Sequence, residues 1–159
     1  MFCGRHLLVA KLRRADLDAA AGAVEEIARI VAQVRRRWPR VRILLRADGG
    51  FARDDLMAWC EANGADFLFG LARNERLVCE IATELDLVAA KSRRTGRPER
   101  RFKSFMWTTR ASWSCRRRVV AKAEWTQGEA NPRFVVTSLK GSARHLYETV
   151  YCQRGQMVG

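Results

Sequence analysis

Apolar positions along the chain recur with two different spacings, which predicts a mixture of strands and helices. Short apolar runs at residues 6–12, 41–47 and 67–72 are typical of buried strands. Residues 17–37 and 54–63 lie between these runs and repeat apolar side chains every three or four positions, as in helices with one buried face. The order strand, helix, strand, helix, strand favours right-handed crossovers and a parallel sheet covered by helices, so an α/β fold is predicted.

The pattern changes in the second half of the chain. Residues 73–87 look helical, and residues 91–101 are polar, basic and interrupted by Gly96 and Pro98, which predicts an exposed loop. Three strand-like runs separated by turn residues then predict antiparallel strands added to the α/β core, at residues 102–109, 115–125 and 133–139.

Length and composition fit a single domain, residues 1–159, in which residues 91–140 form a basic, β-rich insertion. No apolar run approaches the length of a membrane span and the N-terminus lacks the layout of a secretory signal, so we expect a cytoplasmic protein. The five cysteines are scattered and never form a Cys-x-x-Cys pair, and there are only two histidines. A disulfide framework, a zinc site and a serine-type triad are therefore disfavoured.

The net charge of +13 indicates a polyanionic partner such as DNA, because a surplus of this size repels the folded chain from itself. Residues 91–118 contain eleven Lys and Arg residues against one acidic residue, Glu99. The alternative is a solvated loop that happens to be basic. The candidate DNA-binding residues in this region are Lys91, Arg93, Arg94, Arg97, Arg100 and Arg101.

Asp48 is the first candidate for chemistry. The sequence Arg-Ala-Asp-Gly-Gly-Phe places its carboxylate and two glycines where the strand at residues 41–47 should end. Ligands and catalytic groups collect at this carboxyl edge of parallel sheets. The alternative is that Asp48 caps the next helix or begins a turn, and the local pattern does not separate the two interpretations.

Tyr151 and Arg154 form a second candidate pair. Ser142 is expected to cap a last helix that runs from Ala143 onward, with Leu146 on its inner side. Residues three apart lie on one face of such a helix, and position 158 lies one turn further along that face. The alternative is that Tyr151 and Arg154 are an ordinary pair of side chains at the edge of the core, and this motif alone does not exclude it.

Taken together, the Asp48 turn, the strand-rich insertion and the run Tyr-Cys-Gln-Arg-Gly-Gln-Met-Val at residues 151–158 resemble the DDE transposases of bacterial insertion sequences. The group in question carries Tyr-x-x-Arg-x-x-x-Glu in its last helix. The resemblance implies a ribonuclease-H-like core in which three carboxylates hold two Mg²⁺ or Mn²⁺ ions for DNA strand cleavage and transfer. It further implies DNA as partner, no membrane, and self-association of the transposase type.

The resemblance also implies roles for single residues. Asp48 would be the second aspartate, a catalytic residue and metal ligand, and Tyr151 and Arg154 would position DNA phosphate. The chain departs from the family pattern at two positions. The family's first aspartate lies on a strand before the one at residues 6–12, so we expect this chain to lack it, and Val158 stands where the family has its glutamate. Because one carboxylate of three cannot hold a metal pair, we expect a truncated fragment with an incomplete ribonuclease-H-like core that does not cut or join DNA alone.

Two other functions fit parts of the sequence. A non-enzymatic nucleic-acid-binding module requires only the basic insertion. A small-molecule α/β enzyme could use the Asp-Gly-Gly turn as a phosphate site. It is disfavoured because no Gly-x-Gly-x-x-Gly run or Walker lysine follows a strand.

Overall fold

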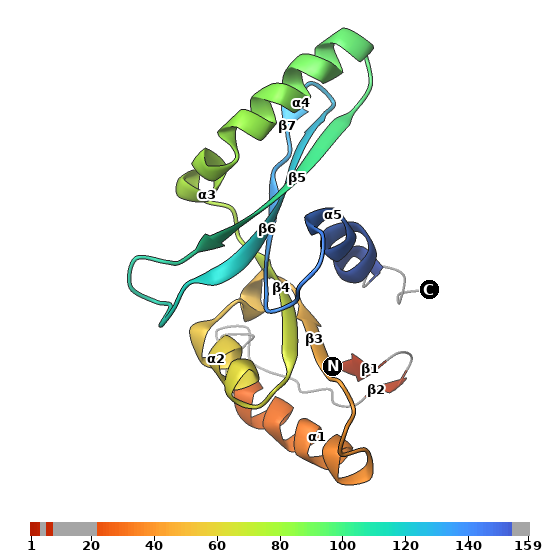
Figure 1. The fold of residues 1–159 in the computed structure, drawn as a ribbon, viewed down its shortest axis with the longest axis vertical. Coiled ribbons are helices and arrows are strands. Elements are labelled where there is room, and N and C mark those ends of the chain that lie inside the picture. Colours follow the sequence, from red (N-terminus) through yellow and green to blue (C-terminus); the bar gives the residue numbers. More distant parts are fainter. Residues whose placement is uncertain (4–5, 8–21, 154–159) are drawn as a thin grey trace, which may run out of the picture.

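The structure, a computed structural model, describes residues 1–3, 6–7 and 22–153. Its main element is a six-stranded mixed sheet, so the fold is mixed α/β (Figure 1). Along the order β3-β4-β8-β6-β5 the first pair is parallel and the other pairs are antiparallel, and β7 pairs with β6. The strands are β3 (Leu44–Ala47), β4 (Asp66–Leu71), β5 (Glu99–Trp107), β6 (Arg117–Thr126), β7 (Glu129–Ala130) and β8 (Arg133–Thr137).

The parallel pair confirms the strands predicted at residues 41–47 and 67–72. The third parallel strand, predicted at residues 6–12, is wrong in its described part. There β2 (His6–Leu7) pairs antiparallel with β1 (Phe2–Cys3) in a separate two-stranded sheet, and residues 8–12 lie outside the described residues. Two residues separate β1 from β2 in the sequence, which suffices for an antiparallel hairpin, whereas a parallel connection needs about a dozen.

The two helices predicted in the first half are present. α1 (Ala23–Arg37) buries Ile27 and Val31, which belong to the predicted apolar face; residues 17–21 lie outside the described part of the chain. α2 (Asp54–Ala62) ends before Gly64, whose φ of +61° is the left-handed conformation that terminates helices readily.

The helical segment predicted at residues 73–87 is confirmed, and it extends further than predicted. It consists of two successive helices, α3 (Glu75–Glu80) and α4 (Ala82–Thr95). The exposed loop predicted at residues 91–101 is therefore wrong at both ends. Lys and Arg are good helix formers that the dipole favours near a C-terminus, so α4 continues through the basic run to Gly96, where φ is 67°. On the other side of the turn, Glu99 already pairs with Trp125 in the sheet.

The three antiparallel strands predicted after this point are confirmed as β5, β6 and β8. Together with α3, α4 and β7 they extend away from α1, α2 and β3, so the molecule is elongated (Figure 1). β4 is buried on both faces: Phe67 and Phe69 belong to the larger core cluster, and Leu68 packs in a second cluster with the last helix.

The last helix begins as predicted. Ser142 Oγ accepts a hydrogen bond from the backbone N–H of His145 at 3.2 Å, and α5 (Ala143–His145) continues into η2 (Leu146–Tyr151), a π-helical turn. Leu146 is buried, as expected. Among the described residues, no helix has both the length and the apolar content needed to cross a membrane.

Candidate functional site

Asp48 lies directly after β3, at the carboxyl end of the parallel strand pair, as the sequence predicts. Its side chain is exposed, and its Oδ1 accepts a hydrogen bond from the backbone N–H of Gly50 at 3.3 Å. This bond caps η1 (Gly49–Phe51), a short 3-10 turn. The capping role and the position at the sheet edge therefore coexist, and one carboxylate oxygen carries the cap.

Tyr151 lies beside the Asp48 turn. A Cβ atom built on Gly70 would be 2.6 Å from the Tyr151 hydroxyl, 3.0 Å from the backbone nitrogen of Gly49 and 3.2 Å from the backbone carbonyl carbon of Asp48. All three groups therefore surround one point above β4 that only a glycine leaves free. The structure thus brings together Asp48 and Tyr151, which lie about a hundred residues apart in the sequence.

A hydrogen bond holds the last helix against β3. The guanidinium of Arg46, on β3, donates from Nη1 to the backbone carbonyl of Val150 at 2.8 Å, in a partly buried position. The partner of Tyr151 in the sequence motif, Arg154, lies outside the described residues, as does Val158.

A cavity of about 260 Å³ opens next to Gly49 and Gly70. Tyr147 and Tyr151 form one wall, with ring centroids 5.6 Å apart, and the exposed Arg73 and Arg133 supply its charged groups. Burial raises the pKa of Tyr147 to about 12, so its hydroxyl stays protonated at neutral pH.

Sequence reasoning missed both arginines of this cavity. Arg73 follows the carboxyl end of β4 as Asp48 follows that of β3, and this parallel placement was the available signal. Arg133 begins β8, whose position beside β4 is visible only once the sheet order is known.

The basic residues predicted to bind DNA lie elsewhere, on α4, the turn after it and the start of β5, toward the end of the molecule remote from β3 (Figure 1). Several of them have partners within the protein. Lys91 pairs with Glu99 at 2.8 Å, Arg93 stacks 5.0 Å from the ring centre of Trp125, and Arg100 pairs with Glu148 at 3.1 Å. The exposed ones without a hydrogen bond or ion pair from the side chain to any described residue are Arg94, Arg97 and Arg101.

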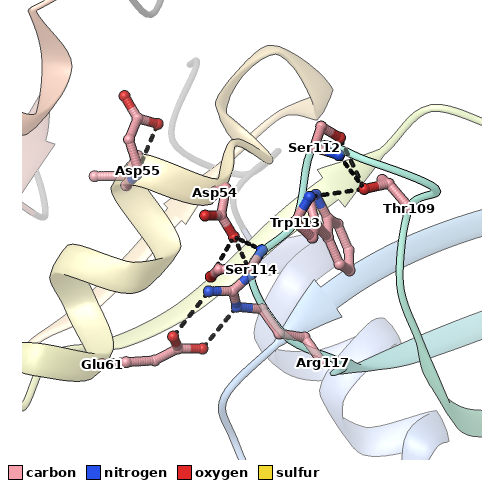
Figure 2. Close-up of polar contacts among 9 residues, drawn as sticks. Asp54, Asp55, Glu61, Thr109, Ser112, Trp113, Ser114 and Arg117 are labelled. Carbon is pink, nitrogen blue, oxygen red and sulfur yellow. Dashed lines mark hydrogen bonds and ion pairs between the residues drawn. The ribbon is translucent and has the colours of Figure 1, made fainter.

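Figure 2 shows an ionic cluster, formed around the buried Arg117, that connects α2 to the loop between β5 and β6. Arg117 is only 3% exposed and donates to Asp54 Oδ1 at 2.6 Å and to both carboxylate oxygens of Glu61 at 2.7 and 2.9 Å. Ser114 adds hydrogen bonds from its backbone N–H and its hydroxyl to the same oxygen of Asp54, at 2.8 and 2.9 Å. The cluster fixes the loop between β5 and β6 against the first and last turns of α2.

The pKa values of this cluster follow from its contacts. Hydrogen bonds to Glu61 raise the pKa of Arg117 more than its own burial lowers it, so this group is always charged. Partial burial raises the pKa of Asp54, but hydrogen bonds from Ser114 and Arg117 outweigh this effect and the net pKa is lowered. Asp54 and Glu61 lie seven residues apart on one face of α2, and this spacing was the sequence signal that could have revealed the cluster.

The divalent metal pair implied by the resemblance requires several carboxylates that lie close together. Within residues 1–3, 6–7 and 22–153, no three His, Cys, Asp or Glu side chains lie close enough to hold a metal ion. Asp54 and Glu61 are occupied by Arg117, and Asp48 offers a single carboxylate. The described residues therefore fit one ligand of such a site and do not by themselves fit a metal pair.

In a comparison with protein families, the family described as "Transposase DDE domain group 1" matches residues 1–158. Comparisons with curated proteins and with solved structures gave no match.

Proposed function

The chain belongs to the transposase DDE domain family of group 1, and on this premise we propose that it supplies part of a DNA strand-cleavage and strand-transfer site centred on Asp48. The observation that carries the proposal is the point above Gly70, where the Tyr151 hydroxyl and the Asp48–Gly49 backbone meet. In the resemblance drawn from the sequence, Asp48 is a metal ligand and Tyr151 faces DNA phosphate. Their closeness supports one site formed by both.

We further propose a ribonuclease-H-like core for this chain. The parallel pair β3 and β4, the connection through α2 and the last helix packed on β4 support that assignment. In this arrangement Asp48 occupies the sheet edge and contributes one oxygen ligand for Mg²⁺ or Mn²⁺.

The cavity beside Tyr151 is proposed to receive a DNA phosphate. Arg73 and Arg133 give it two positive charges, and none of the described residues that line it is acidic. Guanidinium groups form bidentate, charge-assisted hydrogen bonds with phosphate, and the protonated hydroxyl of Tyr147 can donate one more. Arg154, three residues after Tyr151, is proposed to add a further contact.

The chain alone is proposed to be unable to cut or join DNA. Among the described residues, no three His, Cys, Asp or Glu side chains lie close enough to hold a metal ion, and Val158 stands where the family pattern has glutamate. Stabilising both the entering and the leaving oxygen of a phosphodiester requires two metal ions, and one carboxylate does not hold them. Activity would then need carboxylates from another source.

A strand-cleavage assay with purified chain, labelled DNA and Mn²⁺ tests this proposal. We expect no cleavage, together with Mn²⁺ binding that is weak and is lost in Asp48→Asn. Cleavage that disappears in Asp48→Ala would contradict the inactivity while supporting Asp48 as a catalytic residue. Mn²⁺ binding that is equal in wild type and Asp48→Asn would contradict the role of Asp48 as a ligand.

A non-enzymatic nucleic-acid-binding module is the second candidate. This candidate is favoured by three exposed arginines that could bind DNA without any contribution from Asp48. They are Arg94 on α4, Arg97 in the turn after it and Arg101 on β5. Anisotropy titrations of labelled duplex DNA separate the two. A double variant Arg73→Gln, Arg133→Gln should weaken binding more than Arg94→Gln, Arg97→Gln if the cavity holds phosphate, and the reverse order would favour the module.

A further inference from the structure

The last turn of α1 and the connection from it to β3 carry an unusual concentration of positive charge. Residues 35–42 contain five arginines and no acidic residue. Trp38 lies among them and is 60% exposed, the largest exposed fraction among the large apolar side chains that the structure describes. The backbone holds it in place, because its N–H donates to Val34 and its carbonyl accepts from Val41.

Roles within the fold explain only part of this charge. Arg35 donates to the backbone carbonyls of Asn63 and Gly64, at 2.7 and 3.0 Å, and so supports the end of α2. The helix dipole favours Arg36 and Arg37 in the last turn of α1, but its effect fades within one turn and does not account for Arg40.

The remaining arginines are available for a partner. Arg36, Arg37 and Arg40 are exposed, and their side chains form no ion pair or hydrogen bond with any residue in the described ranges. Arg42 lies 3.5 Å from Asp66, but its side chain is 87% exposed, so this pair contributes little to stability. We call Arg36, Arg37, Trp38, Arg40 and Arg42 the basic–aromatic turn.

We propose that the basic–aromatic turn binds a single-stranded segment of nucleic acid. Arginines contact the phosphates, and Trp38 stacks on an unpaired base. Single-stranded nucleic acids are bound by this combination of positive charge along the backbone and an exposed aromatic face. A buried or half-covered tryptophan could not accept a base, and a duplex offers no unstacked base to it.

This surface is separate from the site at Asp48. β3 begins two residues after Arg42 and ends one residue before Asp48, and its four residues span about 13 Å at 3.3 Å per residue. The proposal therefore does not depend on catalysis at Asp48. A strand bound here could extend along β3 toward Asp48, but binding at the turn requires only its own side chains.

The test uses the full chain and a labelled (dT)20 oligonucleotide in anisotropy titrations at several salt concentrations. Trp38→Ala should weaken binding by about fivefold or more, the lower limit expected for loss of one stacked base, while Trp38→Phe should retain most of the affinity. The double variant Arg37→Gln, Arg40→Gln should lower the slope of log K against log salt by about 1.4, or about 0.7 for each lost phosphate contact.

The matched control removes two exposed charges elsewhere, in Arg110→Gln, Lys140→Gln, and should change the slope by less than half as much. All variants are exposed substitutions whose folding is checked by circular dichroism. Equal reductions of the salt slope in the two double variants would indicate a diffuse electrostatic attraction and would overturn the proposal. An unchanged affinity of Trp38→Ala for (dT)20 would also overturn it.

Two further arms separate this surface from other partners and from the Asp48 site. Binding to phosphatidylserine vesicles that is lost in Trp38→Ala, with unchanged (dT)20 binding, would identify a membrane surface and overturn the proposal. Asp48→Asn should leave the Trp38 effect intact, so failure at one site is not read as failure at the other.

Discussion

The close approach at Gly70 leads to a quantitative prediction about Gly70→Ala. The added methyl group would lie 2.6 Å from the Tyr151 hydroxyl, 3.0 Å from Gly49 N and 3.2 Å from the carbonyl carbon of Asp48. The last two atoms are backbone and cannot rotate away, so the Asp48 turn must shift. Overpacking of this kind costs about 1–3 kcal/mol, and replacing a strand glycine returns about 0.5–1 kcal/mol by restricting the unfolded chain.

We therefore expect Gly70→Ala to lower the free energy of unfolding by about 1–2 kcal/mol, which corresponds to about 2–4 °C in Tm per kcal/mol. Gly50→Ala is the matched control, because its Cβ would meet nothing closer than 3.6 Å and should be neutral or slightly stabilising. Urea denaturation followed by fluorescence measures both.

A double-mutant cycle with Tyr151→Phe isolates the contact itself. Phe lacks the hydroxyl that lies nearest the new methyl group, so part of the cost of Gly70→Ala should disappear, with a coupling energy of about 1 kcal/mol. Strict additivity of the two substitutions would refute the inference that the Tyr151 hydroxyl lies over Gly70, next to the Asp48 turn.

Three other predictions concern the ionic cluster and the thiols. Arg117→Met should lower the free energy of unfolding, measured in urea, by about 2–3 kcal/mol. This is below the usual loss for a broken buried ion pair, because Asp54 and Glu61 are partly solvated. The variant of the exposed neighbour, Arg116→Met, should lower it by less than about 1 kcal/mol, and similar losses in the two variants would contradict a structural role for the cluster. The pKa of Asp54 is lowered in the folded protein, so its contribution to stability is present above its ordinary pKa of 3.8 and is lost as the pH falls through the lower folded value. The difference in free energy of unfolding between wild type and Asp54→Asn should therefore disappear in this acidic range. A difference that does not change with pH would refute the lowered pKa of Asp54. Cys60 is buried, and its pKa is raised to about 12, mainly by burial. An alkylating reagent should therefore modify the four exposed cysteines of the native protein quickly and Cys60 only after denaturation. Rapid reaction of all five cysteines in the native protein would contradict the packing of α2.

Local patterns were sufficient to predict the elements around Asp48. The apolar run of β3, the following Asp-Gly-Gly and the periodicity of α2 are all properties of neighbouring residues, and the structure places them as predicted. The last helix and its Ser142 cap were also predictable for this reason.

Long-range partners were not predictable in the same way. The apolar run at residues 6–12 indicated a strand but carried no information about its neighbour, and its described part pairs with β1. Arg117 is one of three successive arginines, and nothing local distinguishes the buried one from its exposed neighbour Arg116. The extent of α4 was underestimated because charge was taken as a sign of a loop, although Gly96 is the residue that ends the helix.

The position of β8 limits how this protein can be re-engineered. The segment between α4 and the last helix supplies β8, and β8 forms the antiparallel neighbour of β4, whose residues from Phe67 to Phe69 are fully or almost fully buried. Deleting the whole segment would strip the hydrogen-bonding edge of β4 and uncover its apolar side chains. A shortened version must keep β8 and remove only the outer hairpin, and a graft into another scaffold must bring its own partner for that edge.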